Sequence, residues 1–157
     1  MSQKVNNQVF FGANDGTNGM ELWKSDGTAS GTVLVKDIFP GSGSSSIGYI
    51  TAVESQVYFV ANNGTNGVEL WKSDGTTDGT VMVKDIRAGN GSSFPAALAA
   101  MGSTLLFSAT DGANGAELWK DGWNSRRYGD GERHSHQWRF ISFASCEHEW
   151  RHLFLCR

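Results

Sequence analysis

Short hydrophobic runs, each bounded by glycine, asparagine, aspartate or serine, follow one another along most of the chain. Near its middle they fall at residues 49–53, 56–61, 68–72 and 80–86. Runs rich in β-branched and aromatic residues between such turn residues are typical of β-strands. No part of this stretch shows a sustained helical period. The pattern therefore predicts four consecutive strands and an all-β fold.

These predicted strands do not alternate cleanly between hydrophobic and polar residues. Val57–Val60 and Val81–Val83 are hydrophobic at every position. Because neighbouring side chains of a strand point to opposite faces of its sheet, both faces of this sheet need to be buried. A sheet that lies between two other sheets meets that requirement, whereas an antiparallel sheet with one face in water does not.

The pattern repeats along the chain. The string ELWK occurs at 21–24, 69–72 and 117–120, a spacing of 48 residues each time. Between 9–45 and 57–93, 27 of 37 positions are identical. Four strands in 48 residues is the size of one β-propeller blade. The sequence thus predicts tandem four-stranded antiparallel units in an incomplete β-propeller-like array, divided at about 9–56, 57–104 and a partial third unit at 105–120.

The longest repeated strings are ELWKSDGTASGTVLVKDI at 21–38 and ELWKSDGTTDGTVMVKDI at 69–86. They resemble the ELWxxDGT repeat, a bacterial family of tandem repeats whose fuller form is ELWxxDGTxxGTxxVKDI. The resemblance covers residues 9–120 and implies a non-catalytic scaffold or adhesion-type binding array in a large secreted or cell-surface protein. Closed propellers have about four to eight blades, so we expect this chain to be a fragment of a larger array. The motif residues that we expect to be structural are Glu21, Leu22, Trp23, Asp26, Gly27, Thr28, Glu69, Leu70, Trp71, Asp74, Gly75, Thr76, Glu117, Leu118 and Trp119.

The Asp-Gly-Thr step of the motif lies between two predicted strands. An aspartate there can accept hydrogen bonds from the backbone of its own turn, and glycine supplies a positive φ. In the string VELWK at 68–72, alternation places Glu69 and Trp71 on one face. We therefore expect Glu69 to lie at a strand edge or to be paired, with Lys84 of the next strand as the candidate partner.

Three classes of function are compatible with the repeats. In the first, the loops 14–19, 62–67 and 111–115 contact a surface protein or a glycan, although the same residues are more simply interpreted as hairpin turns. Further copies of the repeat are the other expected partners. In the second, calcium stabilises a surface repeat domain. The candidate oxygen ligands are Asp15, Asp26, Asp74, Asp78 and Asp111, but no EF-hand or G-G-x-G-x-D pattern occurs, and Asn63 replaces aspartate in one repeat.

The third class is an enzyme, such as a propeller glycosidase. The first 120 residues contain no histidine or cysteine, and their acidic residues recur from unit to unit. A catalytic pair of carboxylates usually occurs once. The sequence therefore predicts a protein without enzymatic activity and without a cofactor other than possible calcium.

Charge and hydropathy exclude further classes. The net charge of -3 leaves no basic surface for nucleic acid, and no run approaches the roughly 20 apolar residues of a membrane-spanning helix. Met1–Lys4 leads directly to Val9–Phe11, so the chain shows no signal-peptide core. We therefore expect any extracellular location to depend on the parent protein.

The composition changes after Lys120. All four histidines and both cysteines lie in the last 37 residues. Their spacings are H-x-H, C-x-H, H-x3-H and H-x3-C, which do not form the paired pattern of a structural zinc site. The six candidate ligands are His134, His136, Cys146, His148, His152 and Cys156.

One added nucleotide near the Lys120 codon explains this change. Trp123 requires the codon TGG and Asn124 a codon that begins with AA, so a shifted frame reads GGA, glycine, across them. Continued with permitted codons, this frame gives DGTADGTVMVKDIR over 122–136, which differs at one position from DGTTDGTVMVKDIR at 74–87. We interpret 121–157 as a frameshifted, non-native tail. A divergent terminal cap is the alternative, and the coding DNA distinguishes the two.

Overall fold

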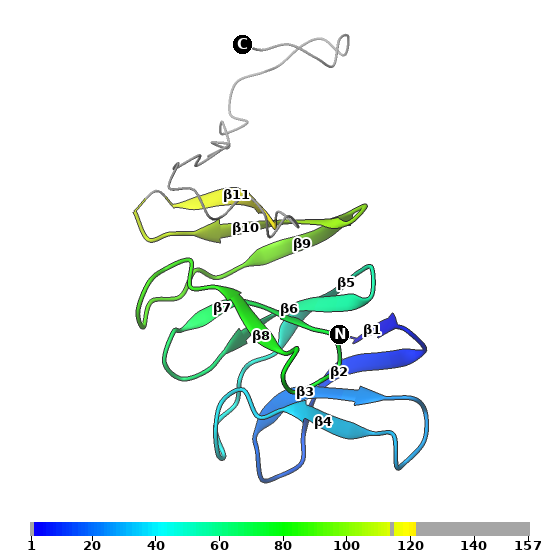
Figure 1. Ribbon diagram of the computed structural model, residues 1–157. Coiled ribbons are helices and arrows are strands. Elements are labelled where there is room, and N and C mark those ends of the chain that lie inside the picture. The colour runs from blue at the N-terminus through cyan, green and yellow to red at the C-terminus, as the bar shows by residue number, and fades with distance from the viewer. Residues whose placement is uncertain (1, 114, 122–157) are drawn as a thin grey trace, which may run out of the picture.

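The computed structural model describes residues 2–113 and 115–121 (Figure 1). The described residues hold eleven strands and no helix, which confirms the predicted all-β fold. The predicted strand 80–86 is shorter in the structure, because Asp85 and Ile86 leave the ladder to begin a connection. The strands are β1 Ser2–Val5, β2 Gln8–Asn14, β3 Met20–Ser25, β4 Val33–Lys36, β5 Gly48–Val53, β6 Gln56–Asn62, β7 Val68–Ser73, β8 Val81–Lys84, β9 Ala96–Met101, β10 Thr104–Thr110 and β11 Ala116–Lys120.

The strands form three antiparallel sheets stacked one on the next (Figure 1). We call β1–β4 the first sheet, β5–β8 the middle sheet and β9–β11 the third sheet. Their first strands are neighbours, since β1 contacts β5 and β5 contacts β9. Sheets that meet along their first strands are arranged like propeller blades around a centre. The described part of the chain is therefore an incomplete propeller-like array, as predicted.

The 48-residue period holds strand by strand. β2, β6 and β10 begin at residues 8, 56 and 104, and β3, β7 and β11 begin at residues 20, 68 and 116. The predicted units 9–56 and 57–104 end with β5 and β9, which are the first strands of the next sheets. Each sheet therefore begins one strand earlier than the predicted unit. The connection before β5 or β9 thus carries the chain from one sheet to the next.

Two hydrophobic layers hold the stack together. The middle sheet has an upstream face, Val57, Phe59, Ala61, Trp71 and Met82, that packs against Val5, Phe10, Leu22 and Val35 of the first sheet. Its downstream face, Val53, Tyr58, Leu70 and Val83, packs against Leu98, Leu105, Phe107, Ala109 and Trp119 of the third sheet. We use upstream face and downstream face for the equivalent positions of every sheet.

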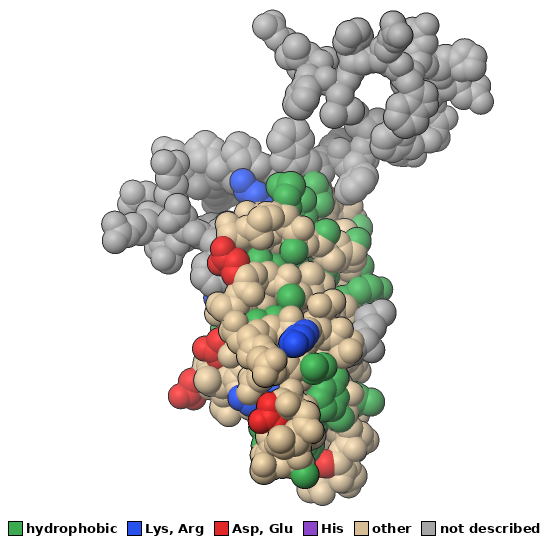
Figure 2. All heavy atoms as spheres, turned by 90° about the vertical axis from the view of Figure 1, so that its right-hand side faces the viewer, with side chains coloured by type: hydrophobic (Ala, Val, Ile, Leu, Met, Phe, Trp, Pro, Cys, Tyr) green, Lys and Arg blue, Asp and Glu red, His purple; other side chains and the backbone are tan. Residues whose placement is uncertain are grey.

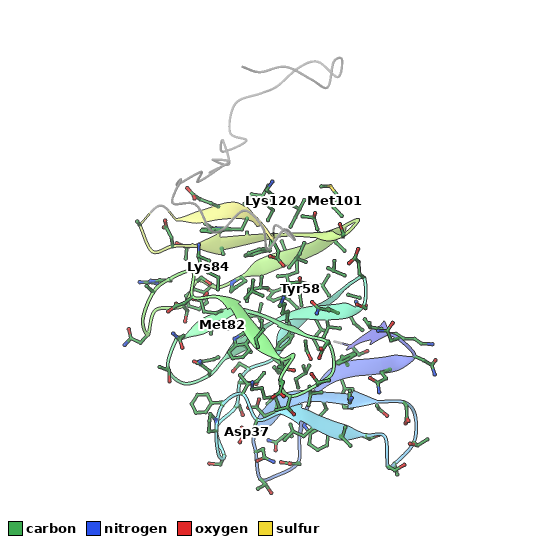
Figure 3. The ribbon with its side chains drawn as sticks, in the orientation of Figure 1. Asp37, Tyr58, Met82, Lys84, Met101 and Lys120 are labelled. Atoms are coloured by element: carbon green, nitrogen blue, oxygen red, sulfur yellow. The ribbon has the colours of Figure 1, made fainter. Side chains whose placement is uncertain are left out.

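Burial of both faces of the middle sheet is therefore confirmed. Every side chain from Val57 to Ala61 on β6 is buried. In Figure 3, Met82 lies on the side of the first sheet, whereas Tyr58 and Lys84 lie on the side of the third. The stack thus places a strand such as β6, which is hydrophobic at consecutive positions, where neither of its faces meets water.

Candidate functional site

The glutamate of the ELWK string is buried and holds the connection between two sheets. Glu21 on β3 is 0% exposed. Its Oε2 accepts a hydrogen bond from the backbone N–H of Ile38 at 2.9 Å, and its Oε1 accepts from those of Phe39 at 3.3 Å and Ser45 at 3.1 Å. Burial raises the pKa of Glu21, while these N–H donors oppose the shift by stabilising the carboxylate. The side chain therefore fixes the path by which the chain leaves the first sheet.

Glu69 has the same role in the middle sheet. It is 0% exposed, and it accepts hydrogen bonds from the N–H of Ile86 at 3.2 Å and of Ser93 at 3.0 Å. Glu69 is therefore paired, but the predicted partner Lys84 and the alternative position at a strand edge are both wrong. β7 lies between β6 and β8, and Lys84 is opposite Leu70, with its Nζ 5.7 Å from the ring centre of Trp119. The backbone of the connection supplies the donors that we expected from a lysine.

Two serines complete this connection. The Ser45 N–H also donates to the Met20 carbonyl of β3 at 3.0 Å, and the Ser45 carbonyl accepts from Asn62 of β6 at 2.8 Å. Ser93 repeats the arrangement with Val68 at 3.1 Å and Thr110 at 2.9 Å. Each serine therefore joins two consecutive sheets. The sequence analysis missed these residues, although their spacing of 48 was the available signal.

The leucine and tryptophan of the motif pack in the hydrophobic layers. Leu22 and Leu70 are 0% exposed on the downstream faces, and Trp71 is 6% exposed on an upstream face. Trp119 donates its Nε1 hydrogen to the Ala109 carbonyl at 2.9 Å. Trp23 and Leu118 are only half-buried, because they lie on the outer faces of the end sheets. Glu117 is 6% exposed at the corresponding position of the third sheet.

The Asp-Gly-Thr step forms a closed turn in both complete units. Asp26 Oδ1 accepts from the backbone N–H of Thr28 at 2.9 Å and from its hydroxyl at 2.7 Å. Asp74 accepts from Thr76 at 2.8 Å and 2.7 Å in the same way. These bonds, led by the threonine hydroxyl, lower the pKa of Asp26 and of Asp74. Gly27 and Gly75 take positive φ values of 94° and 92°, as the turn requires.

The second glycine of DGTxxGT has a separate role that the sequence analysis missed. A Cβ on Gly79 would lie 2.1 Å from Asp74 Oδ1, and a Cβ on Gly31 would lie 2.0 Å from Asp26 Oδ1. Only glycine lets the chain pass this close to the aspartate side chain. The motif is thus a set of mutual packing constraints within one turn.

The three candidate contact loops close on themselves. Asp15 Oδ1 accepts from the N–H of Thr17 at 2.9 Å and of Asn18 at 2.8 Å, and Asn63 makes the corresponding bonds to Thr65 and Asn66. The hydrogen bonds, of which that from Asn18 is the strongest influence, lower the pKa of Asp15. In the third loop, Asp111 accepts from Ala113 at 2.8 Å. Asn114 lies outside the described residues. All three loops are hairpin connections with exposed tips at Thr17, Thr65 and Ala113.

The structure does not bring the candidate calcium ligands together. Asp15 and Asp111 lie on β2–β3 and β10–β11 loops, whereas Asp26, Asp74 and Asp78 lie on turns at the other end of β3 and β7. Within residues 2–113 and 115–121, no three histidine, cysteine, aspartate or glutamate side chains form a group that could hold a metal ion. The six candidate zinc ligands and the remainder of the 121–157 segment lie outside the described residues, apart from Asp121.

Contacts between sheets also involve polar groups. Lys36 Nζ donates to the carbonyls of Thr80 at 2.8 Å and Thr77 at 3.3 Å, and Thr77 Oγ1 donates to the Val35 carbonyl at 2.9 Å. The Tyr58 hydroxyl donates to Asp121 Oδ2 at 2.7 Å. Polar groups therefore hold neighbouring sheets at specific points, in addition to the hydrophobic layers.

Comparisons with protein-family models, curated proteins and solved structures give no match. Within the described part of the chain, no helix is long and apolar enough to cross a membrane.

Proposed function

We propose that the chain is a non-catalytic repeat scaffold of the ELWxxDGT type, part of a larger extracellular or cell-surface array. In this proposal, the repeated loops 14–19, 62–67 and 111–115 present a row of contacts to a surface protein or a glycan. Loops carried by a rigid scaffold are common places for binding residues. The row has a fixed spacing, because the connections around Ser45 and Ser93 join each sheet to the next.

The observation that carries the proposal is the set of hydrogen bonds that the acidic motif residues accept. Glu21 and Glu69 accept hydrogen bonds from the inter-sheet connections, and Asp26 and Asp74 accept them from their own turns. Each role occurs in both units, although the two glutamates differ in some of their further donors. A glycosidase instead needs one pair of carboxylates that flank the substrate bond. The repeated acidic residues are therefore better explained as structural than as catalytic.

The loop proposal is tested by binding of the 157-residue chain to a panel of immobilised glycans and to intact cells whose surface proteins have or have not been removed by protease. We expect the double variant Thr17→Arg, Thr65→Arg to weaken binding at least tenfold, because both side chains are at exposed loop tips. The control, Ala29→Arg with Ser30→Arg, adds the same charge at the other end of β3. Equal binding by both variants would contradict the loop proposal.

The non-catalytic part is tested separately with a panel of glycosides. We expect no hydrolysis by the chain. Turnover that is lost in a Glu69→Gln variant whose strand content is unchanged by circular dichroism, but kept in Asp78→Asn, would show that the motif glutamate is catalytic, and the proposal would be wrong.

Calcium binding remains the alternative that thermal unfolding can test. A rise in melting temperature on addition of calcium chloride, reversed by a chelator, would favour it over the plain scaffold.

A further inference from the structure

The upstream face of the first sheet is hydrophobic and only partly covered. Strand register places Phe11 opposite Trp23, and Trp23 opposite Leu34. Val9 and Ala13 share this face with Phe11, since they lie two residues away on β2. Val9 is 37% exposed, whereas its equivalent in the middle sheet, Val57, is 0% exposed. The first sheet therefore leaves open a face that the middle sheet buries.

The same kind of face is already bound twice inside the chain. In the middle sheet, Val57, Phe59 and Trp71 pack against the downstream face of the first sheet. In the third sheet, Leu105 and Phe107 pack against the downstream face of the middle sheet, with Trp119 beside them. The residues equivalent to these are Val9, Phe11 and Trp23 in the first sheet. Their natural counterpart is therefore another downstream face.

The third sheet provides such a face. Its downstream positions are Met101, Leu106 and Leu118, which are equivalent to Val53, Tyr58 and Leu70. Met101 is 62% exposed and lies at the end of the stack beyond the third sheet (Figure 3). The chain thus carries one half of a sheet-to-sheet interface at each end.

We propose that the upstream face of the first sheet binds the downstream face of the third sheet in a second copy of the 157-residue chain. In this proposal, the three sheets that the described residues form in each of two copies close a ring of six. Head-to-tail contacts either close into a ring or continue as a filament. Closure is favoured here because consecutive sheets meet along β1, β5 and β9, as blades do around a centre. Six sheets fall within the propeller range of about four to eight. This inference concerns the 157-residue chain by itself and does not depend on the proposed loop function. In a larger array, neighbouring repeats would occupy the same two faces.

A polar end cap is the competing explanation, since terminal repeats often have a polar outer face. β1 carries Ser2 and Lys4 where the middle sheet has Ile50 and Ala52. Lys4 can lay its hydrocarbon stem on an apolar surface and keep its ammonium group in water. The contact between copies is therefore expected to be weaker than the contacts between sheets of one chain. On the side of the stack that faces the viewer in Figure 2, Lys, Asp and Glu of the described residues are scattered among the hydrophobic side chains.

The test is sedimentation equilibrium of the full chain over a range of concentrations. We expect a monomer of 17.0 kDa at low concentration and twice that mass at high concentration. Val9→Asp and Met101→Asp change opposite halves of the interface at positions that are exposed in the single chain. Each is expected to raise the dissociation constant at least tenfold. Val81→Asp is the matched control, since Val81 is 38% exposed on β8, which belongs to neither end sheet.

Circular dichroism checks that each variant keeps its strand content, and Met101→Asp provides a second test if Val9→Asp does not fold. Four outcomes would overturn the proposal. The first is a monomer at every concentration, as a polar cap predicts, and the second is association that both variants leave unchanged. The third is association that is lost with Val9→Asp alone, which indicates that the first sheet binds the first sheet of the other copy. The fourth is a mass that grows without limit, which indicates an open filament.

Discussion

β2 and β6 have closely related sequences, QVFFGAN and QVYFVAN, but different surroundings. All five side chains from Val57 to Ala61 of β6 are buried, whereas Phe10 is the one buried side chain of β2. Among the described residues, β6 has a sheet on each side, and β2 has one on its downstream side only. Burial in this fold is thus set by the number of neighbouring sheets more than by the residues of the strand itself.

The largest expected loss in the free energy of unfolding comes from removing a phenylalanine from a hydrophobic face. Phe59→Ala should lower the free energy of unfolding by about 3–5 kcal/mol, because it leaves a cavity in a closed layer. Phe11→Ala should cost less than about 2 kcal/mol, since its site is half-exposed and can collapse or fill with water. Urea unfolding at a concentration where the chain is monomeric measures both. Equal losses would show that the two faces do not differ as the structure indicates.

Removing the buried glutamate should destabilise the chain by a similar amount in the first and middle sheets, unlike removing a phenylalanine. Glu69→Ala leaves the N–H groups of Ile86 and Ser93 without their acceptor, and we expect a loss of about 2–3 kcal/mol in the free energy of unfolding. Glu21→Ala should cost a similar amount, because its partners also belong to the connection that follows its own sheet. The exposed Asp78→Ala is the control and should stay within about 0.5 kcal/mol. A much smaller loss for Glu21→Ala would show that the connection after the first sheet contributes less to the free energy of unfolding than the connection after the middle sheet.

The second glycine of the turn gives a smaller effect. Gly79→Ala should cost about 1–3 kcal/mol of unfolding free energy, because the added Cβ overlaps the Asp74 carboxylate. In an Asp74→Ala background the same change should cost less, since the carboxylate is gone. A double-mutant cycle measured by urea unfolding gives the coupling. Additive losses would mean that the aspartate is not what excludes alanine.

The smallest effect concerns pH and the first loop. Hydrogen bonds lower the pKa of Asp15 in the folded chain, so its stabilising contribution is full above the pKa of an unfolded aspartate. That contribution is lost as the pH falls through the lower, folded value. NMR titration of the Asp15 carboxyl should therefore give a midpoint below that of an aspartate in an unstructured peptide. Asp15→Asn, which copies Asn63, should keep the loop but remove this acid-dependent step from the amide exchange of Thr17. A midpoint at or above the peptide value would contradict the turn geometry.

Much of the local structure could be predicted from the sequence. The turn signals located the strands, and the consecutive hydrophobic residues of β6 indicated burial on both faces. The error at Glu69 has a physical cause. Alternation along a strand gives the face of a side chain, but it gives no information about a connection that folds back over the strand end. The closeness of Gly79 to Asp74 was hidden for the same kind of reason, since a contact across five residues depends on the turn conformation.

The sequence by itself determined the all-β class, the 48-residue period and the Asp-Gly turns, because these depend on local preferences and on repetition that can be counted along the chain. The tertiary structure alone decided which glutamate oxygens meet which N–H groups, where Ser45 and Ser93 join the sheets, and which of two similar strands is covered. Those properties depend on neighbours that are far apart in the sequence. Identical motifs therefore acquire different exposure according to their place in the stack.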